Sequence, residues 1–120
     1  MMHAALLGDI VKSRSLPDRG ALQRKLIATL EKANERFAAV LASRFMVNSG
    51  DSFQGIAASD APVLEVCDFI QYSLRPECSV RFGIGYGEIA TAIDPRQSVL
   101  ADGAAFWNAR DASESLHRTN

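Results

Sequence analysis

The sequence has few of the features that mark specialised classes of protein. Among its 120 residues are only two cysteines, Cys67 and Cys78, without the paired Cys/His spacing of a zinc site. Two cysteines do not make a disulfide framework, so we expect a reducing, cytoplasmic setting. Cys67 falls on an apolar helical stripe, where we expect a small buried side chain and not a reactive thiol.

Membrane and nucleic-acid signals are also missing. No apolar run approaches the roughly 18 residues that span a bilayer, and the opening residues carry no basic segment of a secretory signal. The formal net charge is −1, without a run of like charge, so we expect no direct nucleic-acid binding by this segment. Binding of a single nucleotide is not excluded, since a phosphate site needs only a few protein groups. With no repeat or linker, residues 1–120 are predicted to form one compact domain.

The first half of the chain predicts a strand, a helix and a hairpin. An apolar run, His3–Leu7, stops at Gly8-Asp9 and favours a buried strand. Asp18 is the expected N-cap of a long amphipathic helix. Two short strands, Arg44–Asn48 and Phe53–Ala57, flank a Gly50-Asp51 turn of type II′. The apolar residues that recur at helical spacing are Leu22, Leu26, Leu30, Ala33, Phe37, Val40 and Leu41.

The second half predicts another helix and more strands. Ser59 or Asp60 would cap a helix that has Pro62 in its first turn and ends at Arg75-Pro76. Its buried stripe is Val63, Val66, Cys67, Ile70 and Leu74. Two β-rich segments follow, Ser79–Ile84 and Tyr86–Ile93, and a last helix begins at Gly103.

Three glycines interrupt these β-rich segments: Gly83, Gly85 and Gly87. They open no helix, so the pattern is not a dinucleotide-binding loop. A β-bulge or close strand packing explains them instead.

This order of elements predicts an α+β, ferredoxin-like βαββαβ domain with a C-terminal strand and helix. The first strand then lies in the middle of an antiparallel sheet, beside one strand of the hairpin. That topology brings Asp9 near Asp51 at one edge of the sheet.

Two neighbouring carboxylates need a counter-charge, which a divalent cation supplies. Oxygen ligands suit Mg²⁺ or Mn²⁺, which often also takes oxygens from a substrate phosphate. We therefore expect Asp9 and Asp51 as metal ligands, with Gly8, Ile10 and Gly50 close to a phosphate. The alternative is structural: Asp51 as a turn former and Asp9 bonded to its own backbone.

Three basic residues are candidates for phosphate contacts: Lys12, Arg14 and Arg110. The first two fit a solvated loop equally well. Arg110 lies on the predicted last helix, where an ion pair with Asp111 or Glu114 is the alternative.

Four segments resemble the SatD family of bacterial proteins. They are AALLGDIVKSR (4–14), SGDSFQG (49–55), VRFGIGYGEI (80–89) and LADGAAFWNARDA (100–112). The resemblance implies a longer chain with a helical, DNA-binding C-terminal part, so we expect residues 1–120 to be the N-terminal part of a longer protein.

The same segments are more distantly similar to the catalytic domain of class III nucleotidyl cyclases. This similarity implies that Asp9 and Asp51 match the two metal-binding aspartates of that family. The chain departs from it where the cyclases carry an asparagine and an arginine on the last helix, since Trp107 and Asp111 stand there. A purine-selecting aspartate is replaced by Leu100, and a lysine by Arg44.

These observations predict metal-dependent binding of a nucleoside triphosphate or a similar small molecule and leave catalysis open. If the domain is an enzyme, cyclase-like or other phosphoryl-transfer chemistry follows. The alternative is a non-catalytic regulatory or dimerisation module that keeps the cyclase-like scaffold. A homodimer fits both.

Overall fold

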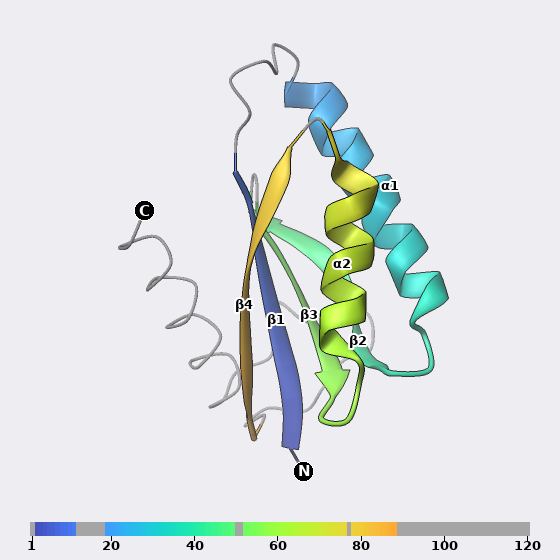
Figure 1. The fold of residues 1–120 in the computed structure, drawn as a ribbon, viewed down its shortest axis with the longest axis vertical. Coiled ribbons are helices and arrows are strands. Elements are labelled where there is room, and N and C mark those ends of the chain that lie inside the picture. Colours follow the sequence, from blue (N-terminus) through green and yellow to red (C-terminus); the bar gives the residue numbers. More distant parts are fainter. Residues whose placement is uncertain (1, 12–18, 50–51, 77, 89–120) are drawn as a thin grey trace.

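A computed structural model describes residues 2–11, 19–49, 52–76 and 78–88, and all structural statements concern these residues. Four antiparallel strands form one sheet in the order β2-β3-β1-β4. Two helices cover one face of it (Figure 1). The predicted α+β, ferredoxin-like arrangement, with the first strand inside the sheet, is confirmed. The elements are β1 (Met2–Val11), α1 (Arg19–Arg36), β2 (Leu41–Ser49), β3 (Ser52–Ala58), α2 (Val63–Leu74) and β4 (Ser79–Glu88).

Strand β1 is central because it pairs with β3 on one side and β4 on the other. Its residues Ala4, Leu6 and Ile10 belong to the core that the helices cover. Successive side chains of a strand point to opposite faces. The half-buried Asp9 therefore lies on the sheet face away from α1 and α2.

Aromatic rings fill the space above two glycines of the sheet. Gly8 is paired with Phe53 on β3 and Phe82 on β4, and these two rings meet edge to face at 5.9 Å. A Cβ atom added at Gly8 would lie 2.1 Å from Cζ of Phe53. At Gly55 the added Cβ would lie 2.7 Å from Cδ1 of Phe45. At both positions, glycine is required by close packing of a neighbouring ring.

Each helix holds one outer strand through a side-chain amide. On α1, Asn34 accepts a hydrogen bond from the Phe45 N–H at 2.7 Å and donates one to the Phe45 carbonyl at 3.0 Å. On α2, Gln71 accepts from the Val80 N–H at 2.7 Å and donates to the Val80 carbonyl at 3.0 Å. We call these two contacts the amide clamps. They satisfy the backbone N–H and carbonyl of Phe45 in β2 and of Val80 in β4.

Several boundaries differ from the sequence-based expectation. Helix α1 ends at Arg36, and Leu41, expected on its apolar stripe, begins β2 instead. The N-cap of α2 is Pro62, without a side-chain cap hydrogen bond, so the expectation of Ser59 or Asp60 was wrong. Proline has a preset φ and no N–H to satisfy, which suits the start of a helix.

Strand β4 is continuous across its glycines. Its register with β1 runs from Ser79 to Glu88 without a shift, so it contains no bulge. The alternative of close strand packing is supported, since Gly83, Gly85 and Gly87 are all buried. The expected turn at Asp94-Pro95 and the last helix lie outside the described residues.

The buried stripe predicted for α2 is confirmed, including Cys67. Burial, and secondly the charge of Asp68, raise the pKa of the Cys67 thiol to about 12. Neither α1 nor α2 is long and apolar enough to cross a membrane.

The raised pKa of Cys67 predicts a loss of stability in alkaline solution. The unfolded thiol ionises near pH 9, whereas the folded thiol stays neutral to about pH 12. Ionisation therefore favours the unfolded chain, and the free energy of unfolding falls as pH rises through this window. Urea titrations from pH 8 upward measure the slope. Cys67→Ala is expected to reduce it, and an unchanged slope would contradict this origin.

Candidate functional site

Asp9 lies where β1 passes the start of β3. Its Cα partner on β3 is Ser52, the residue that directly follows Asp51 in the chain. Within the described residues, the β1–β3 pairing runs as far as this pair, and β1 is paired with β4 through Ile10 and Val11. The described backbone thus brings Asp9 beside the end of the hairpin, as the topology predicted. Metal binding by Asp9 and Asp51 remains a prediction.

A cation that sequence reasoning missed stands across from Asp9. Arg81 of β4 is its Cα partner on the other side, and both side chains are half-buried. Directly opposed residues of opposite charge attract one another across a sheet. An arginine here can also bind a phosphate oxygen. Arg81 belongs to the VRFGIGYGEI segment, but only the strand register shows that it faces Asp9.

Gly8 and Ile10 have clear structural roles. The Phe53 ring occupies the space above Gly8, which accounts for the glycine without a ligand. The Ile10 side chain belongs to the core and is 6% exposed. Any contact of Ile10 with a phosphate would therefore have to come from its backbone. Its described strand partner is Val80 on β4.

The remaining predicted site residues lie outside the described ranges. They are Lys12, Arg14, Gly50, Asp51 and Arg110. Within residues 2–11, 19–49, 52–76 and 78–88, no three His, Cys, Asp or Glu side chains form a group that could hold a metal ion. Of the two predicted metal ligands, only Asp9 lies within the described residues. Asp51, the other predicted ligand, directly precedes Ser52 in the chain.

The fold is similar to that of nucleotidyl cyclase domains. A bacterial light-regulated adenylyl cyclase matches with a TM-score of 0.69 and 15% identity, over 98% of this chain and 70% of that chain. The catalytic core of a rhodopsin-guanylyl cyclase in complex with ATPαS matches with a TM-score of 0.66 and 16% identity, over 93% and 71%. The guanylate cyclase domain of RhGC from Catenaria anguillulae, in complex with GTP, matches with a TM-score of 0.59 and 16% identity, over 93% and 72%. At these identities the similarity shows the fold alone.

No curated protein matches the chain. A family model does match, and it covers nearly all of the sequence: the model of the SatD family aligns with residues 3–120. The segments quoted above lie within that match. The chain belongs to the SatD family.

Proposed function

We propose that this SatD-family domain binds a nucleoside triphosphate through a divalent cation held by Asp9 and Asp51. The observation that carries the proposal is the register of β1 and β3, in which Asp9 stands opposite Ser52, the neighbour of Asp51. Mg²⁺ and Mn²⁺ prefer carboxylate oxygens and commonly share a substrate's phosphates. The cation would neutralise both carboxylates and attract the phosphates to this edge of the sheet.

Arg81 adds a second reason to expect a phosphate there. Its guanidinium group is on the strand beside Asp9 and on the same face of the sheet. It can donate paired hydrogen bonds to phosphate oxygens, while a cation at Asp9 binds others. Two proteins of similar fold, in complex with ATPαS and with GTP, support this expectation. The proposal stops at binding, because Trp107 and Asp111 stand where cyclases carry an asparagine and an arginine.

Thermal unfolding with Mg²⁺ or Mn²⁺ and each nucleoside triphosphate tests this proposal. At 100 times its dissociation constant, a ligand of the folded state adds about 2.7 kcal/mol of stability. We expect a metal-dependent rise in melting temperature for the wild type. Asp9→Asn and Asp51→Asn, which keep side-chain shape and remove charge, are expected to abolish it.

Asp60→Asn is the matched control, because Asp60 is exposed and lies outside the candidate site. It should leave the rise unchanged. Absence of a rise with every nucleotide would contradict the proposal and favour the regulatory or dimerisation module. A rise that survives both Asp9→Asn and Asp51→Asn would place the ligand elsewhere.

A further inference from the structure

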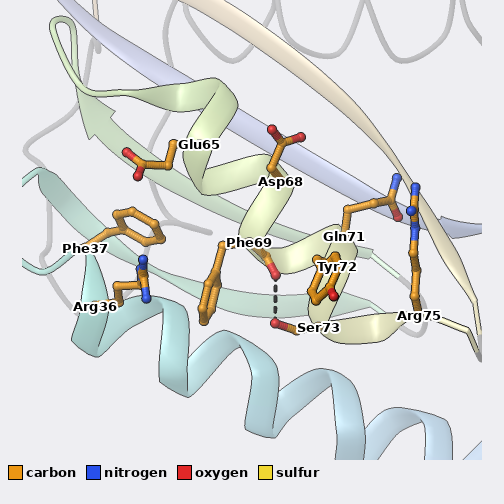
Figure 2. A pocket seen from close by; sticks show the side chains of 9 residues that line it. All are labelled: Arg36, Phe37, Glu65, Asp68, Phe69, Gln71, Tyr72, Ser73 and Arg75. Atoms are coloured by element: carbon orange, nitrogen blue, oxygen red, sulfur yellow. Dashed lines mark hydrogen bonds between the residues drawn. The ribbon is translucent and has the colours of Figure 1, made fainter.

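A cavity of about 510 Å³ opens on the outer side of the helices, between the end of α1 and α2. It is separate from the Asp9 edge, which lies on the opposite face of the sheet. Its volume is in the range of small-molecule sites. Figure 2 shows its lining: Arg36, Phe37, Glu65, Asp68, Phe69, Gln71, Tyr72, Ser73 and Arg75.

A stacked guanidinium group forms one end of the cavity. The Arg36 guanidinium carbon lies 5.1 Å from the ring centre of Phe69 and 5.7 Å from that of Phe37. The two rings meet edge to face at 5.7 Å, so they form a rigid support. Cation–π contact holds the guanidinium group in place without using its N–H donors. These donors remain suited to a carboxylate, which they can bind in a bidentate manner.

A carboxylate stands at the same end. In Figure 2 the Glu65 carboxylate lies on one side of the Phe37 ring and Arg36 on the other, whereas Asp68 points away from that ring. Among the described residues, neither Arg36 nor Glu65 forms an ion pair. Two opposite charges that share a cavity without neutralising one another can each bind a group of a ligand that carries both signs.

Aromatic surface continues from these charges along α2. Phe69 is half-buried, and Tyr72, one turn further on, is 78% exposed. In Figure 2 both rings follow Arg36 along the side of α2 that faces α1. A flat apolar body can stack there. Two other polar side chains of the lining are already engaged: Ser73 donates to the Phe69 carbonyl at 2.7 Å, and Gln71 forms an amide clamp.

We propose that this cavity binds a small zwitterion with an aromatic body, of the chemical class of the aromatic amino acids. Arg36 binds its carboxylate, Glu65 binds its ammonium group, and the ring lies against Phe69 and Tyr72. In an α-amino acid the two charged groups share one carbon, so one end of the cavity accommodates both. Neither Asp9 nor a nucleotide takes part in this site.

Titration with L-tryptophan, followed by backbone amide NMR, tests the proposal. We expect saturable shifts at the end of α1 and along α2. Tryptamine lacks the carboxylate and indole-3-propionate lacks the ammonium group, so each should bind at least about tenfold more weakly. Arg36→Gln and Glu65→Gln should each weaken L-tryptophan binding by a similar factor.

Arg24→Gln and Asp60→Asn remove the same charges from exposed positions outside the cavity, and they should leave binding unchanged. All four substitutions are at exposed side chains, and unchanged amide spectra elsewhere confirm that the variants fold. The proposal is overturned if no compound gives saturable shifts at these helices. It is also overturned if a singly charged analogue binds as tightly as L-tryptophan.

Discussion

Gly8→Ala is expected to lower the free energy of unfolding by about 3 kcal/mol, at the upper end for overpacked cores. The added methyl group would lie 2.1 Å from Cζ and 2.5 Å from both Cε atoms of Phe53. That ring is 1% exposed and packs against Phe45 and Phe82, so it has no free space into which to move. Urea unfolding measures the loss.

Two other glycines provide the comparison. At Gly55 the nearest ring atom would be 2.7 Å away, so Gly55→Ala is expected to cost less than Gly8→Ala. Gly20 is exposed on α1, and Gly20→Ala should raise stability by about 0.5 kcal/mol by restricting the unfolded chain. In a Phe53→Leu background, Gly8→Ala should lower the free energy of unfolding much less, because the added methyl group no longer meets the Phe53 ring. A Gly8→Ala cost below about 1 kcal/mol would show that the ring yields easily.

Asn34→Ala is expected to cost about 3 kcal/mol, because it leaves both the N–H and the carbonyl of Phe45 without their partner. Phe45 is itself 2% exposed, so its surroundings offer little water in exchange. Chemical denaturation measures the change. Glu35→Ala, at the exposed neighbouring residue, is the control and should stay within about 0.5 kcal/mol of the wild type.

Asn34→Asp separates the hydrogen bonds from packing. The introduced carboxyl group can donate to the Phe45 carbonyl only when it is protonated, so folding raises its pKa. A raised pKa gives stability that is present at low pH and is lost as pH rises. The variant should therefore approach the wild type as pH falls toward about 4 and lose stability above it. A pH-independent deficit would show that the amide fills space and does not act through the Phe45 carbonyl.

The order and type of the elements were predictable because each depends on nearby residues. The three- and four-residue spacing of Leu26, Leu30 and Ala33 indicates a helix wherever it occurs. The antiparallel topology then placed Asp9 near the hairpin. Strand register is different, since it depends on which residues meet across the sheet. For this reason Arg81 was not recognised as the neighbour of Asp9.

The role of Gly8 also depends on a residue far away in the sequence. A glycine before an aspartate suggested room for a phosphate, whereas the structure fills that room with a ring 45 positions away in the sequence. The start of α2 was misjudged because Ser59 and Asp60 are favoured caps in isolation. In the folded chain the helix begins after Pro62, two positions beyond Asp60.

The amide clamps have a consequence for aggregation. Strands β2 and β4 are the edge strands of the described sheet. Unpaired backbone groups on an edge strand can pair with a strand of another molecule. At Phe45 and Val80 those groups are already bonded to side chains of the same chain. An incoming strand would have to break two hydrogen bonds for every two that it forms there. The helices thus protect the edge strands from pairing with another molecule, in addition to covering the core.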